Sequence, residues 1–227
     1  MESLLLDAPA LIRRQFALEG IGLDADERLV RVPGGAAEEI PRLYVARHAG
    51  GYARFFRRDL PDDVVAWLEA LPAEAALSEP DRVKQVLALD GPLAGTWAGT
   101  SYAVERPPDP AIYPDVSVLT AAQGELTGRF DPDVLNRGPV YAVLLDGQIV
   151  SACVSARENA EAAEAWVQTV PAYRGRGYAR QTTAAWAGSV LSRGKIAFYS
   201  HLRTNLASKR VALSLGLVPF IDAVGFL

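Results

Sequence analysis

The sequence contains a single cysteine, Cys153, and this scarcity excludes two classes of protein. One cysteine cannot build a disulfide framework or supply a cysteine-based metal site, and burial as a small apolar residue is its ordinary role. The chain also lacks a segment apolar enough to span a bilayer. Its N-terminus, MESLLLDAPA, lacks the basic region and long apolar core of a secretion signal. We therefore expect a cytoplasmic protein with no membrane partner and no metal site.

Acidic residues are scarce at the C-terminal end of the chain. From Pro171 to Leu227 there are eight basic residues and one acidic residue, Asp222, so this segment carries a charge of +7. Because the whole chain has a net charge of −4, the remainder carries −11. A basic end can face nucleic acid, but in an acidic chain it is better suited to a small polyanion. We expect no nucleic-acid partner, although a nucleic-acid-binding module stays a rival interpretation.

At 227 residues, half of them hydrophobic, the chain can form one large domain or two small ones. The best boundary is Arg106–Pro110, because clustered prolines cannot continue a helix or a central strand. We therefore divide the chain into an N-terminal α+β region, 1–106, and a C-terminal domain, 111–227. The N-terminal pattern predicts helices over 4–16, 62–71 (with Trp67 on the buried face) and from Ser78 to Gly91, and strands over 42–46 and 96–105.

The C-terminal domain has the clearest local signals. Asp146-Gly147 separates two strand-like runs, 141–145 and 148–154, and Asp-Gly is the preferred chemistry of a type I′ hairpin turn. The pattern then predicts strands over 162–170, 196–200 and 220–226, with helices over 177–191 and 208–215, the second capped by Ser208. A short strand is expected at 116–119. The connection over 120–138 holds barely one helix.

A glycine-rich turn lies between the strand that ends at Val170 and the helix that begins near Gly177. Pro171 ends the strand, and a helix N-terminus presents unpaired backbone N–H groups to an anion. Neither Gly175 nor Gly177 carries a Cβ, so a phosphate can approach the main chain. Arg174, Arg176 and Arg180 add positive charge. The turn is therefore a candidate phosphate-binding loop.

Three phosphate-binding motifs compete for this loop. A P-loop needs Gly-Lys-Ser/Thr, which is absent, and a dinucleotide fingerprint needs glycine where Arg180 stands. Arg174-x-x-Gly177-x-Ala179 resembles the acyl-CoA pyrophosphate loop of the GCN5-related N-acetyltransferase (GNAT) family. Asn205-Leu-Ala-Ser208 and Leu215-Gly216-Leu217 resemble a later segment of that family, with the spacing kept. The resemblance covers roughly the last 90 to 115 residues, and it implies an α/β fold with a mixed, mostly antiparallel central sheet and flanking helices.

The resemblance also implies a cosubstrate, acetyl-CoA, and the residues that hold it. Main-chain groups of Gln168 and Val170 would bind the pantetheine arm and the thioester carbonyl, where two parallel strands of the family diverge. Asn205 would orient the arm or bridge to the helix that follows. The pyrophosphate would be held by the backbone N–H groups of the loop, which are those of Arg174, Gly175, Arg176, Gly177, Tyr178 and Ala179.

Proton transfer is only weakly signalled. Glu164 lies where some family members carry a glutamate that deprotonates the amine through water, and a solvent-exposed strand-end carboxylate is the alternative interpretation. The family tyrosine that serves as general acid is replaced by Ala212. Tyr199, Ser200 and His201, at the end of the strand predicted over 196–200, are possible substitutes, and the pKa range of histidine suits proton transfer. A surface histidine is the simpler interpretation of His201.

Taken together, the motifs predict an acetyl-CoA-dependent N-acetyltransferase that moves an acetyl group to a primary amine by direct attack on the thioester. The acceptor would be a small-molecule amine or a peptide, the protein a monomer or homodimer, and residues 1–106 a possible wall of the acceptor pocket. The alternative from another class is a non-catalytic acyl-CoA-binding sensor, because the family's acidic tyrosine is absent and the sequence gives only a weak signal for a base.

Overall fold

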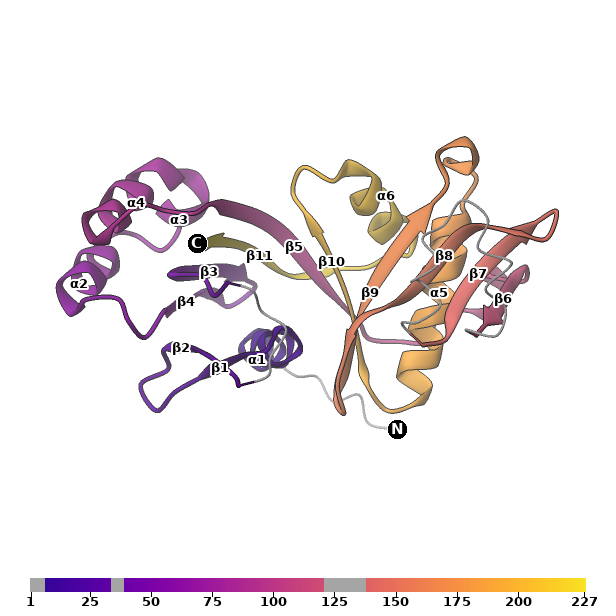
Figure 1. Cartoon of the computed structure of the whole chain (residues 1–227), viewed down its shortest axis with the longest axis horizontal. Coiled ribbons are helices and arrows are strands. Elements are labelled where there is room, and N and C mark those ends of the chain that lie inside the picture. Colours follow the sequence, from indigo (N-terminus) through magenta and orange to yellow (C-terminus); the bar gives the residue numbers. More distant parts are fainter. Residues whose placement is uncertain (1–6, 34–38, 121–137) are drawn as a thin grey trace. The chain divides into compact units, whose positions relative to one another are not determined.

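A computed structural model describes residues 7–33, 39–120 and 138–227 (Figure 1). The chain divides into two compact units. The N-terminal unit comprises Met1–Ser101, His201–Asn205 and Pro219–Leu227, and the C-terminal unit comprises Tyr102–Ser200 and Leu206–Val218. Two strands, β5 (Thr96–Val104) and β10 (Ile196–Leu202), contribute residues to both units. Among the described helices none is long and apolar enough to cross a membrane.

The N-terminal unit is built on a sheet in which β4, β3, β11 and β5 are neighbours in that order. Within this sheet, β3 and β4 are joined by a tight turn that leads into Gly51, whose positive φ of 128° favours glycine. The β1–β2 pair forms a separate two-stranded sheet. Its elements are α1 (Ala8–Glu19), β1 (Ile21–Leu23), β2 (Leu29–Arg31), β3 (Leu43–His48), β4 (Gly51–Phe56), α2 (Asp62–Ala70), α3 (Ala75–Ser78), α4 (Pro80–Leu87), η1 (Ala88–Asp90), β5 and β11 (Pro219–Phe226).

Side-chain alternation along β3 divides the N-terminal core into two clusters. Leu43 and Val45 pack in the cluster that contains the buried faces of α2 and α4. Tyr44 and Ala46 point to the opposite face and pack with Ile12 and Phe16 of α1. One sequence expectation is wrong here: Trp67 of α2 is 48% exposed, while Val64, Val65 and Leu68 form the buried face of that helix.

The C-terminal unit carries the strands β10, β9, β8, β7 and β6 in that order. Only β9 and β10 run parallel, and the other pairs are antiparallel. Asp146 and Gly147 both have positive φ, 50° and 73°, which confirms the type I′ hairpin. The elements are η2 (Pro110–Ile112), β6 (Val116–Leu119), β7 (Val140–Leu145), β8 (Gln148–Glu158), β9 (Ala162–Thr169), η5 (Pro171–Tyr173), α5 (Tyr178–Ser192), β10 and α6 (Leu206–Ser214).

Helix α5 covers one face of this sheet. Its buried Trp186, Ala187 and Val190 pack against Tyr141 of β7 and Cys153 of β8. Cys153 is fully buried, as expected for a lone cysteine, and burial raises the pKa of its thiol far above the usual range. The opposite face holds a second apolar cluster that includes Val140, Ala152 and Trp166. The predicted α/β class, a mixed and mostly antiparallel sheet with flanking helices, is confirmed.

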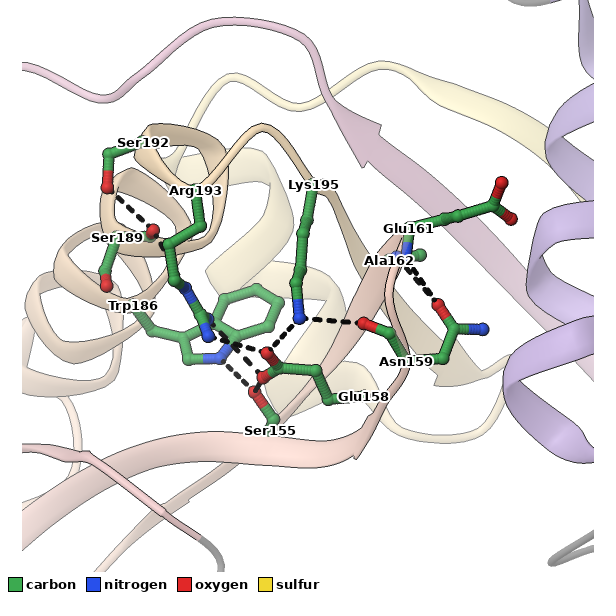
Figure 2. A network of polar contacts seen from close by, with 10 residues as sticks. All are labelled: Ser155, Glu158, Asn159, Glu161, Ala162, Trp186, Ser189, Ser192, Arg193 and Lys195. Carbon is green, nitrogen blue, oxygen red and sulfur yellow. Dashed lines mark hydrogen bonds and ion pairs between the residues drawn. The ribbon is translucent and has the colours of Figure 1, made fainter.

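A polar network ties the C-terminal end of α5 to the β8–β9 turn (Figure 2). The Glu158 carboxylate accepts hydrogen bonds from Arg193 and Lys195, both at 2.6 Å, and from Ser155 at 2.7 Å. Ser155 in turn accepts one from the indole N–H of the buried Trp186 at 3.1 Å. Burial tends to raise the pKa of Glu158, but these donors outweigh it and hold the pKa below its usual value. The network therefore ties the residues that follow α5 to the end of β8.

The compact units divide the chain differently from the proline-rich boundary expected at 106–110. The break falls between Ser101 and Tyr102, and the final strand belongs to the N-terminal unit. β11 pairs with β3 over five residues, from Asp222–Arg47 to Phe226–Leu43. The two units are compact in packing, which says nothing of function, so the functional division into 1–106 and 111–227 stays a prediction.

Candidate functional site

The glycine-rich turn has the conformation that a backbone anion site requires. It begins with the short helix η5, and it delivers the chain to the first residue of α5, Tyr178. Gly175 and Gly177 have φ values of 76° and 82°, in the left-handed region that favours glycine. A Cβ built on either residue would meet no protein atom within 4 Å. The space in front of both glycines is therefore open to a ligand.

Several backbone N–H groups beside this opening form no hydrogen bond within the described part of the chain. The N–H groups of Gly175, Arg176 and Gly177 donate no hydrogen bond to another residue in the described part of the chain. Tyr178 and Ala179 form the first turn of α5, where N–H groups have no acceptor within the helix. No side chain caps this helix, whose N-cap is Gly177. These five donors and the positive end of the helix dipole suit an anion such as a pyrophosphate.

The arginine side chains of the loop are engaged with the loop itself. Arg174 donates from Nε to the carbonyl oxygen of Thr169 at 3.2 Å. Arg176 lies with its guanidinium 5.2 Å from the centre of the Tyr173 ring. Arg180 has a buried Nε that has no partner among the described residues. The first two contacts stabilise the shape of the loop.

The parallel pairing of β9 with β10 ends before β9 reaches this loop. Their parallel ladder contains three residue pairs and ends at Phe198–Glu164. β9 continues to Thr169 while still paired with β8, beyond the last residue of its ladder with β10. Beyond Glu164, the edge of β9 that faced β10 therefore carries main-chain groups outside that ladder. This is the strand divergence that the family resemblance implies.

The register of β9 corrects which residues present those groups. Val170 donates its N–H to the Val150 carbonyl at 2.9 Å, and its own carbonyl accepts the N–H of Tyr173 at 2.9 Å. Main-chain groups alternate between the two edges of a strand, so those of Gln168 also point to β8. The expectation that Gln168 and Val170 offer their main chain to a ligand is therefore wrong by one residue. Val167 and Thr169 face the divergence instead.

Glu164 stands at the closed end of the divergence, as the last β9 residue of the parallel ladder. It is 8% exposed, so the interpretation as a solvent-exposed carboxylate is wrong. Its Oε2 lies 3.7 Å from Nη1 of Arg157, the residue opposite it on β8. An irregularity in β8 between Ser155 and Arg157 sets this register. The sequence analysis did not identify Arg157 as the partner of Glu164.

Tyr199 is buried and its hydroxyl is occupied. The side chain is 2% exposed, and the hydroxyl donates to the main-chain oxygen of Ser208 at 3.2 Å. Burial raises the pKa of Tyr199 to about 12. Ser208 lies inside α6 rather than before it, so the expectation that it caps this helix is wrong. Ala212, at the position of the family's acidic tyrosine, is fully buried.

The two remaining candidates belong to the N-terminal unit. His201 is only 8% exposed, so a surface histidine is excluded, and its Nδ1 lies 2.9 Å from the Leu202 carbonyl oxygen. Asn205 is exposed and directly precedes α6, and its backbone N–H donates to the Leu202 carbonyl at 2.9 Å. Among the described residues, no group of His, Cys, Asp and Glu could hold a metal ion.

The arrangement defines an α/β protein with a glycine-rich loop after the strand β9, beyond the end of its parallel ladder with β10. Residues 122–219 match the sequence model of the GNAT acetyltransferases. The match confirms the resemblance of the motifs, and it assigns this segment to the GNAT acetyltransferase family. Acyl transfer, with an acyl-CoA as donor, is the general activity that this assignment supports. No curated protein shows significant sequence similarity to the chain.

Several solved structures resemble the chain at low identity. A GNAT-family protein from Novosphingobium aromaticivorans has 18% identity and a TM-score of 0.48 over 59% of this chain, and the match spans 65% of that protein. A GCN5-related N-acetyltransferase-like protein from Streptococcus suis has 19% identity and a TM-score of 0.47, covering 83% and 85%. A GNAT-family acetyltransferase from Colwellia psychrerythraea has 13% identity and a TM-score of 0.49, covering 100% and 97%. These values are too low to transfer a function, so the assignment rests on the sequence match.

Proposed function

We propose that the protein is an N-acetyltransferase that uses acetyl-CoA and a primary amine, either a small molecule or a peptide. The observation that carries the proposal is the pairing of two features on one strand. β9 leaves its parallel partner after Glu164, and it leads into a loop in which the N–H groups of Gly175, Arg176 and Gly177 have no partner among the described residues, whereas that of Arg174 donates to the Pro171 carbonyl at 3.3 Å. A long ligand with a phosphate end and a reactive end needs both features in that order.

The residues present suit such a donor. The open space at Gly175 and Gly177 admits a pyrophosphate, and the backbone N–H groups of the loop donate to it. Main-chain groups of Val167 and Thr169 along β9 suit the amide-containing arm. When bound, acetyl-CoA supplies a thioester whose carbonyl carbon forms a bond to the amine nitrogen as its bond to sulfur breaks. An N–H donor fixed beside the carbonyl oxygen stabilises the developing charge by about 3 kcal/mol.

We assign the proton transfer from the amine to Glu164. The residue stands at the closed end of the divergence, and the guanidinium of Arg157 lies 3.7 Å from its carboxylate. An ionised carboxylate can take the proton that the amine loses, directly or through water. Tyr199 is unsuited to protonate the departing thiolate, because its hydroxyl already donates to Ser208.

The missing acid supports a second candidate, a non-catalytic acyl-CoA sensor. Tyr199 is buried with its hydroxyl donating to Ser208, and Ala212 stands at the position of the family tyrosine, so neither of these two positions offers the leaving group a hydroxyl proton. A sensor would keep the loop and the strand divergence and would need no acid. The two candidates therefore share the binding geometry and differ in turnover.

Calorimetry and thiol release separate these candidates. Coenzyme A and acetyl-CoA are titrated into the protein, and free thiol is then followed with acetyl-CoA and a panel of amines. The enzyme binds both ligands and releases thiol only when a suitable amine is present. Binding without release from any amine supports the sensor. Absence of binding to either ligand overturns both candidates.

A further inference from the structure

A cavity of about 350 Å³ lies in the C-terminal unit, apart from the glycine-rich loop. It is bordered by the end of β5, the Glu105–Asp109 segment, Ile112 of η2, Ala187 of α5 and the turn after α6. None of its lining residues belongs to the loop 174–179 or to β9. Its volume is within the range of sites for small organic ligands.

The cavity has apolar walls and a rim on which negatively charged side chains outnumber positively charged ones. Val104, Ile112 and Leu217 are among the apolar residues that line it. Glu105, Asp109 and Arg106 are its charged residues, so carboxylates outnumber guanidinium groups two to one. Asp109 also accepts the backbone N–H of Ala111, whereas Glu105 forms no ion pair with another described residue.

The backbone adds to the negative character of the rim. Helix α6 ends at Ser214, and the next residues, Leu215 and Gly216, line the cavity. The C-terminal end of a helix carries a partial negative charge from its carbonyl groups, so it favours a nearby cation. Gly216 turns the chain there with a φ of 69°, and a Cβ on it would meet nothing within 4 Å. Two prolines, Pro107 and Pro108, stiffen the opposite border, which suits a preformed site.

We propose that this cavity binds a small organic amine in its cationic form. The ammonium group lies at the rim near Glu105 and Asp109, and the apolar body lies against Val104, Ile112 and Leu217. Carboxylates and the helix end attract the cation, while the apolar walls reward removal of a hydrocarbon group from water. The site is additional to the acyl-donor site and does not depend on acyl transfer.

Three ligands of similar size and different charge test the proposal by calorimetry, with the full chain and without any acyl-CoA. They are phenethylamine, the neutral 2-phenylethanol and the anionic 3-phenylpropionate. Phenethylamine is expected to bind at least tenfold more tightly than the other two. Equal affinity for the three ligands, or no binding of phenethylamine at millimolar concentration, overturns the proposal.

Two matched variants locate the site. Glu105→Gln removes one rim charge from an exposed residue, and it is expected to weaken phenethylamine binding threefold to tenfold while leaving 2-phenylethanol unchanged. Asp115→Asn is the control, because Asp115 is equally exposed in the same unit but does not line the cavity. An unchanged affinity in Glu105→Gln, or an equal loss in Asp115→Asn, contradicts the proposed site. Coenzyme A binding, measured separately in each variant, tests the donor site independently.

Discussion

Replacing Gly177 with alanine separates the strain of the loop from its contact with phosphate. Gly177 has a φ of 82°, so an alanine there is strained by about 1–2 kcal/mol whether or not a ligand is bound. A Cβ at this position touches no protein atom, so the variant is expected to fold. In the bound state, the same methyl group occupies the space through which a phosphate reaches the backbone N–H groups.

The size of the effect follows from the hydrogen bonds at risk. A hydrogen bond to a charged group contributes about 1.5–3 kcal/mol, and the loss of one such bond exceeds the 1.4 kcal/mol that corresponds to a tenfold change in affinity. We therefore expect the dissociation constant of coenzyme A to rise at least tenfold in Gly177→Ala, as measured by calorimetry.

Gly194 provides the matched control. It lies after the other end of α5, with a φ of 73° and no atom within 4 Å of a Cβ. Gly194→Ala should lose a similar free energy of unfolding in urea, yet bind coenzyme A as the unaltered protein does. Equal dissociation constants for coenzyme A in the two variants would refute the assignment of Gly177 to the phosphate site, whether both variants bind normally or both bind more weakly.

Three further substitutions test the remaining groups. Glu164→Gln should lower kcat at least tenfold without altering coenzyme A affinity, and the deficit should shrink as rising pH supplies more free amine; a pH-independent loss would indicate a structural role. Tyr199→Phe should leave kcat within threefold and cost about 1 kcal/mol in the free energy of unfolding, and a large fall in kcat would restore the tyrosine as acid. Glu158→Gln should destabilise the protein by about 1–2 kcal/mol at neutral pH in urea unfolding. The pKa of Glu158 is lowered in the folded protein, so the stability that its contacts contribute is present above the ordinary pKa of 4.5 and is lost as pH falls through the folded pKa. A difference in stability between the two proteins that persists in acid would contradict the ion-pair explanation.

Local chemistry was sufficient to predict much of the C-terminal unit. Asp146-Gly147 specifies its turn without help from distant residues, and Gly177 marks where α5 begins. Trp67 shows the limit of periodicity, because neighbouring helix positions differ by about 100° and a pattern cannot fix which flank of a stripe is covered. Its neighbour Leu68 is buried and Trp67 is not.

The sequence predicted the type of candidate site, but not which residues of β9 present their main chain to it. Sequence alone identifies β9 as the strand before the loop, yet the edge to which Gln168 points depends on how β8 pairs with it. The hydrogen bond from Val170 to Val150 fixes that alternation. The short parallel ladder likewise depends on how β9 and β10 pair, and the burial of Tyr199 depends on a residue far away in the chain, Tyr102.

The position of β11 determines how the N-terminal region can be studied. β11 is the last strand of the chain, yet its sheet neighbours are β3 and β5, both from the N-terminal part. A fragment that begins at Asp109 would leave β11 with two unpaired edges and would expose Val224 and Phe226, which are buried in the N-terminal core. Unpaired strand edges and exposed apolar residues favour aggregation. Loss of activity in such a fragment would therefore report loss of folding, and the contribution of residues 1–106 to amine selectivity requires substitutions of single exposed side chains in the full chain.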